Sequence, residues 1–71
     1  MRYTVIVEES ATSWGVYVPG LPGCMAAGGS REEVLRLIRD AIEFHVEGLR
    51  EQGQPIPVPR SHGEVVEAHA A

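Results

Sequence analysis

The sequence predicts a single α+β domain: a three-stranded antiparallel meander, one long helix packed on it and a short C-terminal strand. Three observations predict this order. Apolar residues first alternate with a period of two, the period changes once to 3.6 at Ser30, and alternating prolines follow Gly53. Because 71 residues cannot supply two separate cores, residues 1–71 are expected to form one domain.

The first part of the chain contains three apolar stretches with the pattern of strands. In Arg2–Glu9 and again in Trp14–Val18, every second residue is aromatic or β-branched, as in a strand with one buried face. The hydroxyl-rich residues between them favour a hairpin turn. A third, shorter stretch, Cys24–Ala27, ends at two glycines and completes the predicted meander.

The strongest local signal is a rigid turn before the third strand. It comprises Pro19, Gly20, Leu21, Pro22, Gly23 and Cys24. Two prolines and two glycines at these positions restrict the chain to a tight reversal. Further on, Ser30 and Glu33 have the spacing of a capping box, in which the Glu33 carboxylate reaches back to the Ser30 amide. A helix is therefore predicted from Ser30 to about Gln52, where glycine and then prolines stop it.

This helix is predicted to cover the sheet with one apolar side and to expose charged residues on the other. The apolar side comprises Val34, Leu35, Ile38, Ala41, Ile42, His45, Val46 and Leu49. Leu37 and Phe44 form a second apolar strip, displaced by about 90° or more from the centre of that side. The strip either widens the core or is a contact surface for another chain, and Gly48 beside it leaves room for close approach.

The tail after the helix is proline-rich. In Gln54–Arg60, prolines alternate with Ile56 and Val58, which predicts either a polyproline-like strap across the surface or a bare connector. Glu64–Ala70 contains two adjacent valines and is expected to form the final strand beside the meander.

Composition points to an acidic protein that binds other proteins. The net charge is −4, the six positive charges are all Arg, and the arginines of the predicted helix are interleaved with carboxylates. Nucleic-acid binding needs clustered cations, so we expect no direct DNA binding and a basic protein as partner. The chain has neither Lys nor Asn, which hints at a thermophile. Seven alanines make the core thin, so we also expect a homo-oligomer, either a dimer or a tetramer.

A single cysteine excludes an intramolecular disulfide and indicates a reducing compartment. The chain shows no apolar leader and no stretch of the ~20 apolar residues that a membrane span needs. A cytoplasmic protein without a membrane partner is therefore expected.

The residues that could carry chemistry are better explained by structure. Cys24 lies in an apolar strand without an adjacent base, and His45 lies on the apolar side of the helix. His62 and His69 lack metal-ligand spacing to each other or to His45. We therefore expect no catalytic residue, no metal site, no cofactor, no small-molecule substrate and no enzymatic activity.

The sequence resembles the HicB antitoxin family from Tyr3 to Pro59. The resemblance rests on the Tyr-x-Val-x-Val first strand, Val18–Cys24, Gly29–Glu33, Asp40–Ala41–Ile42 and Ile56–Pro59. It implies a β-β-β-α-β fold, described as a partial ribonuclease H-like fold, without that enzyme's carboxylate cluster. It also implies that the protein neutralises a small basic RNA-cleaving toxin called HicA by covering its active surface.

Many members of that family carry a C-terminal DNA-binding domain, whereas this sequence ends at Ala71. Autorepression is therefore not expected. An orphan, self-assembling relative with no toxin is the alternative. In either case, the buried anchor of a protein interface is expected at Leu37 and Phe44 or at Trp14 and Tyr17.

Overall fold

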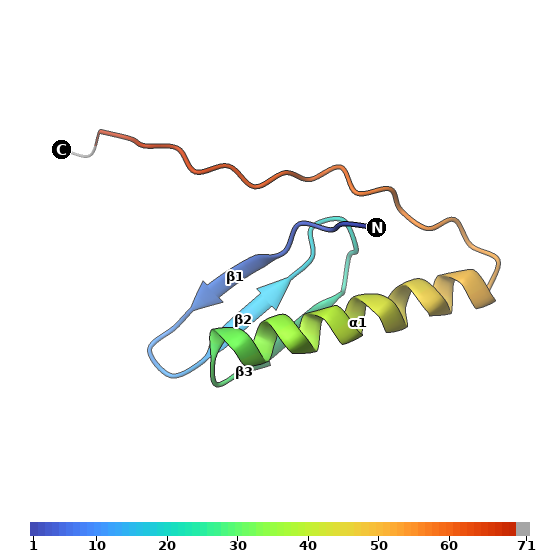
Figure 1. Cartoon of the computed structure of the whole chain (residues 1–71), viewed down its shortest axis with the longest axis horizontal. Helices are drawn as coiled ribbons and strands as arrows, with labels where there is room; N and C mark the ends of the chain where they lie inside the picture. Colours follow the sequence, from blue (N-terminus) through green and yellow to red (C-terminus); the bar gives the residue numbers. More distant parts are fainter. Residues whose placement is uncertain (70–71) are drawn as a thin grey trace.

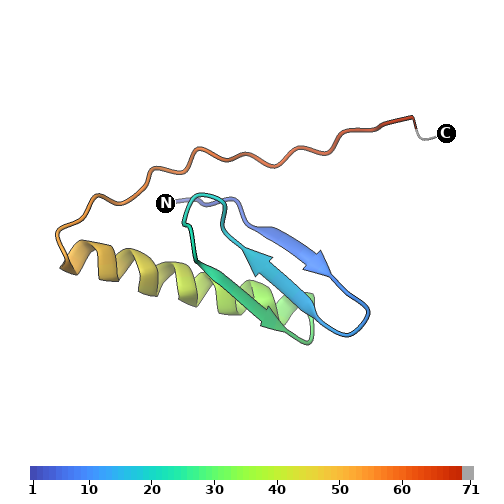
Figure 2. The ribbon, with the colours of Figure 1, turned by 180° about the vertical axis from the view of Figure 1, so that it is seen from behind.

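The computed structural model describes residues 1–69, in which three strands are followed by one long helix (Figure 1). The elements are β1 (Ile6–Glu9), β2 (Trp14–Tyr17), β3 (Met25–Gly28) and α1 (Arg31–Glu51). The helix lies across one side of the sheet, and the tail after it runs back over the edge that carries β1 (Figure 2). The predicted α+β class, the meander and the single helix are thus confirmed.

The sheet is antiparallel with the order β1-β2-β3. The first strand is shorter than the predicted Arg2–Glu9, because Ile6 pairs with Tyr17, the last residue of β2. The chain then turns at Pro19, so residues 2–5 have no strand opposite them. The second strand ends one residue before its predicted end, and the third is shifted by one residue toward the C-terminus relative to the predicted Cys24–Ala27.

The turn between β2 and β3 is closed by three backbone hydrogen bonds. The Leu21 N–H donates to the Val18 carbonyl at 3.0 Å, and the Cys24 N–H donates to the Leu21 carbonyl at 3.0 Å. The Val18 N–H donates to the Cys24 carbonyl at 3.1 Å and closes the outer ring. Gly23 has φ 84°, a left-handed conformation that favours glycine. Leu21 is thereby held pointing into the core, where it is fully buried.

The core lies between α1 and the sheet. Its buried residues are Val16, Val18, Leu21, Cys24, Val34 and Ile38. Two come from one face of β2 and its extension, two from the turn before β3, and two from α1. Trp14 packs against this core from the far end of β2. The small residues of β3 keep the core thin, as the alanine content predicts.

Both ends of α1 are capped by local hydrogen bonds. The Ser30 hydroxyl accepts from the Glu33 N–H at 3.1 Å, as predicted. The Glu33 carboxylate, however, accepts from the Gly29 N–H at 3.2 Å and not from Ser30. The C-terminus has the Schellman pattern: the Gln54 N–H donates to Leu49 at 2.9 Å, and Gly53 adopts φ 68°.

The tail forms no strand in residues 54–69, so the predicted C-terminal strand is wrong for the described part, and Ala70 lies outside it. Two hydrogen bonds tether the tail: the Tyr3 hydroxyl donates to the Pro57 carbonyl at 2.7 Å and the Thr4 hydroxyl to Ser61 at 2.6 Å. Both donors are side-chain hydroxyls, and no backbone–backbone hydrogen bond joins the described part of the tail to the N-terminal segment, as strand pairing requires. The tail is a tethered strap, not a bare connector.

Candidate protein-interaction surfaces

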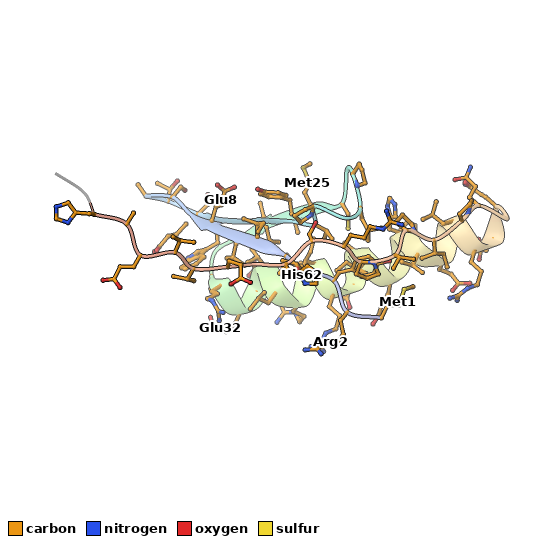
Figure 3. The ribbon with its side chains drawn as sticks, turned by 90° about the horizontal axis from the view of Figure 1, so that it is seen from above. Met1, Arg2, Glu8, Met25, Glu32 and His62 are labelled. Carbon is orange, nitrogen blue, oxygen red and sulfur yellow. The ribbon has the colours of Figure 1, made fainter. Side chains whose placement is uncertain are left out.

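The residues that could carry chemistry are separated in the structure. In residues 1–69, no three His, Cys, Asp or Glu side chains gather closely enough to hold a metal ion. Cys24 is a buried free thiol within the core, and burial raises the pKa of this thiol. His62 is exposed on the tail beside the N-terminal segment (Figure 3), and His69 is exposed further along. None of these side chains is paired with a group that would activate it.

The strip at Leu37 and Phe44 lies on the exposed flank of α1. Phe44 is 83% exposed and Leu37 is 37% exposed, so the strip does not merely widen the core. Beside it is a shallow hollow of about 230 Å³, lined by Phe44, His45, Gly48, Leu49 and Gln52. A side-chain carbon added at Gly48 would meet no atom within 4 Å. An exposed aromatic ring therefore lies next to an empty recess on the same helix.

A second apolar surface lies on the side of the sheet that faces away from α1. Ile6 pairs with Tyr17, and Tyr17 pairs with Met25, so the three form one row across the sheet. Val16, one position along β2, is buried on the helix side, which places this row on the opposite face. Tyr17 is 42% exposed and Met25 66% exposed. We call these three residues the sheet row.

The sheet row is bordered by a carboxylate. Glu8 follows Ile6 by two positions on β1 and therefore lies on the same face. Figure 3 shows Glu8 and Met25 projecting from the sheet on the side away from α1. Sequence reasoning proposed Tyr17 but missed Ile6 and Met25. The alternation of side chains along each strand indicates which residues share a face, but only the strand register brings Ile6, Tyr17 and Met25 together.

Trp14 and Tyr17 do not form a common anchor. They are three positions apart on β2 and therefore point to opposite faces of the sheet. Trp14 packs against the core, whereas Tyr17 is exposed on the open face. Of the expected interface residues, the structure thus leaves Tyr17, Leu37 and Phe44 available on two separate surfaces.

A third feature is a groove between the N-terminal segment and α1. The helix packs mainly against β2 and β3, which leaves the inner side of the first strand partly uncovered. The groove has a volume of about 490 Å³ and is lined by Met1, Tyr3, Val5, Leu35, Ile38, Arg39, Ile42 and Glu43. Its rim carries both charge signs, so it does not select a partner by charge.

Comparison with known proteins identifies the family of this chain. The family model for the HicB-like antitoxin of bacterial toxin–antitoxin systems matches residues 3–70. The chain belongs to the HicB-like antitoxin family. Among similar proteins of this kind, Antitoxin HicB 2 of Photorhabdus laumondii is 38% identical over 68 residues, which are 90% of this chain and 46% of that protein.

Other relatives differ in length. A UPF0150 protein of Thermoplasma acidophilum is 37% identical over 71 residues, 99% of this chain and 100% of the relative. An uncharacterised protein of Haemophilus phage HP1 is 35% identical over 57 residues, 80% of this chain and 43% of that protein. The HicB-like chain thus spans less than half of some relatives and the whole of another.

No solved structure matched the chain significantly. The likeness to a partial ribonuclease H-like fold therefore stays a prediction from the family. In residues 1–69, no helix has the length and apolar character needed to cross a membrane.

Proposed function

We propose that this chain is the antitoxin of a toxin–antitoxin pair and that it binds and neutralises a small basic HicA-like RNA-cleaving toxin. The observation that carries the proposal is membership of the HicB-like antitoxin family over residues 3–70. The place of action is the cytoplasm, where such a toxin meets RNA.

The sheet row is the surface we assign to the toxin. Tyr17 and Met25 supply exposed apolar area on a paired, hydrogen-bonded sheet, so little backbone conformational entropy is lost when they bind. Glu8 beside them and the net charge of −4 attract a basic partner. This charge complementarity speeds encounter and makes the association sensitive to salt.

The strip at Leu37 and Phe44 is the surface we assign to self-association. It lies on α1, separate from the sheet row, so a homo-oligomer can form without covering the toxin-binding face. A second chain would also add apolar contacts to a domain whose own core is thin.

The test is co-expression with a small basic HicA-like toxin, with growth arrest as the readout. The unaltered chain should rescue growth and form a complex in a low-salt pull-down. Tyr17→Ala should weaken that complex by at least about tenfold, the loss typical of an interface anchor. Met25→Asp is compared with Val58→Asp, because both side chains are 66% exposed and only Met25 lies in the sheet row.

Rescue that fails, with no complex at low salt, would contradict the antitoxin assignment and favour the orphan, self-assembling alternative. Rescue that persists in both sheet variants would leave the antitoxin role and refute the assigned surface. The acidic balance also predicts that residues 1–71 alone do not bind duplex DNA, which an electrophoretic shift assay tests directly.

A further inference from the structure

Positive charge is concentrated where the tail passes the N-terminal segment. Residues 1–5 and 59–63 contain Arg2, Arg60 and His62 but neither Asp nor Glu, so all ten acidic side chains lie elsewhere in the chain. With His neutral, the net charge of −4 divides into +2 for these two segments and −6 for the rest (2 − 6 = −4). Because the two segments are far apart in the sequence, only the fold brings these cations together.

A crevice lies between the two segments. Its volume is about 420 Å³, within the range typical of small-molecule sites. Among the described residues, no carboxylate lines it, and five of its six lining residues have polar side chains. Figure 3 shows Arg2 on the N-terminal segment and His62 on the tail beside it. We call this site the tail crevice; its lining residues are Arg2, Tyr3, Thr4, Pro59, Ser61 and His62.

The walls of the tail crevice are held together without a ligand. The Thr4 hydroxyl donates to the Ser61 carbonyl at 2.6 Å, and the Tyr3 hydroxyl donates to the Pro57 carbonyl at 2.7 Å. A side-chain carbon added at Gly63 would lie 3.8 Å from the Thr4 methyl group, so the tail stays close beyond Ser61. A ligand therefore meets a preformed site and does not have to order the tail.

Both walls have hydrogen-bond donors to spare. Within residues 1–69, Arg2 and His62 form no ion pair and no side-chain hydrogen bond. The Ser61 hydroxyl and the backbone N–H groups of Ser61 and His62 likewise have no partner in the described chain. The Ser61 carbonyl, by contrast, already accepts from Thr4. The tail crevice thus offers positive charge and free donors, which is the complement of an anion.

We propose that the tail crevice binds a phosphate group, either free or carried by a small molecule. The guanidinium fork of Arg2 can donate to two phosphate oxygens, while His62 and the Ser61 hydroxyl donate from the opposite wall. A phosphate monoester carries a charge of about −1.5 to −2 at neutral pH and three acceptor oxygens. A carboxylate has a single charge and two oxygens, so it satisfies fewer of these donors.

The charge distribution favours a small ligand over a nucleic acid. Nucleic-acid binding draws its affinity from several phosphates neutralised by clustered cations. Outside the two segments the chain carries a net charge of −6, which repels further phosphates. No residue of the tail crevice belongs to the sheet row or to the strip at Leu37 and Phe44. The proposal is therefore independent of the antitoxin assignment.

Amide NMR spectra of the full chain, titrated with sodium phosphate at about pH 7.5 and constant ionic strength, test the site. Shifts should saturate at residues 3, 4, 61 and 62, with a dissociation constant on the order of 1 mM. Arg2→Gln and His62→Gln should each weaken binding, Arg2→Gln by at least about tenfold, because a charge-assisted hydrogen bond is lost. Arg36→Gln is the matched control: it removes the same charge from an exposed position on α1 and should leave the affinity within about twofold.

Three further titrations identify the ligand. Adenosine 5′-monophosphate that binds more tightly than inorganic phosphate would support a nucleotide as the carrier, and equal or weaker binding would support free phosphate. Sodium acetate that saturates the same shifts as strongly as phosphate would overturn the choice of phosphate. A short single-stranded RNA without terminal phosphates that binds more tightly than either phosphate compound would overturn the choice of a small ligand.

Protection from trypsin provides a second measurement. A ligand that bridges both walls should slow cleavage after Arg60 about tenfold at ten times its dissociation constant, whereas potassium chloride of equal ionic strength should not. A peptide substrate controls for inhibition of the protease itself. Shifts that do not saturate, shifts confined to the N-terminus of α1, or unchanged affinity in both Arg2→Gln and His62→Gln would overturn the proposal.

Discussion

Leu21→Ala should destabilise the domain more than any other single truncation in the turn. Leu21 is 0% exposed and, with Val34, is one of the two largest fully buried side chains among residues 1–69. Replacing a buried leucine by alanine removes transfer free energy and leaves a cavity, at a cost of about 2–5 kcal/mol in proteins.

The site of Leu21 places the expected cost near the middle of that range, at about 3 kcal/mol. The cavity cannot close easily, because three hydrogen bonds of 3.0–3.1 Å hold the turn around it and proline lies on either side. A 71-residue chain has a free energy of unfolding of roughly 4–10 kcal/mol at 0.05–0.15 kcal/mol per residue. The variant should therefore lose between about 30% and 75% of its free energy of unfolding.

Urea unfolding, followed by Trp14 fluorescence and by circular dichroism at one fixed protein concentration, measures this loss. Trp14 packs against the core and reports on it directly. Val58→Ala is the control, because Val58 is 66% exposed, and its unfolding free energy should change by no more than about 0.5 kcal/mol. A loss of less than about 1 kcal/mol in Leu21→Ala would refute the argument that the turn is packed rigidly around this side chain.

Three further predictions concern single groups. Ser30→Ala removes the hydroxyl that accepts from the Glu33 N–H at 3.1 Å and should lower the unfolding free energy by about 1 kcal/mol in the same urea assay; an unchanged midpoint would contradict the cap. Tyr3→Phe removes the 2.7 Å bond to the Pro57 carbonyl, and trypsin should then cut after Arg60 several-fold faster; an unchanged rate would contradict the tether. Burial raises the pKa of the Cys24 thiol above the ordinary 9.0, so the folded chain keeps a proton that the unfolded chain releases, and stability should fall as pH rises above about 9. Cys24→Ala should show a smaller fall over that range, measured by thermal unfolding, and an equal fall would contradict the role of the thiol.

The local pattern of residues determined most of the secondary structure. The single change of hydrophobic period predicted α1 almost to the residue, because Ser30 and Gly53 cap it through contacts within a few positions of the chain. The turn before β3 was equally readable, since proline fixes φ and glycine permits the left-handed conformation that Gly23 adopts, whatever lies elsewhere in the chain. The same residues carry the resemblance to the HicB-like antitoxin family, whose model matches residues 3–70.

Pairing between distant segments decided the rest. Arg2–Glu9 alternates along its whole length, yet only Ile6–Glu9 is a strand, because a strand needs a partner and β2 ends at Tyr17. The segment from Glu64 has the valines of a strand, but the tail is tethered earlier, at Pro57 and Ser61, and residues 64–69 form no strand. Neither the short first strand nor the unpaired tail can be predicted from the local sequence.

Of the two candidate surfaces, one can be predicted from the local sequence and the other depends on strand pairing. The strip at Leu37 and Phe44 follows from helical periodicity alone, since every residue of a helix has a calculable direction. The sheet row of Ile6, Tyr17 and Met25 required the register, because its members come from three strands. Sequence determines the directions of neighbouring side chains through backbone geometry, whereas the proximity of distant ones depends on which segments hydrogen-bond to each other, and only the tertiary structure decides that.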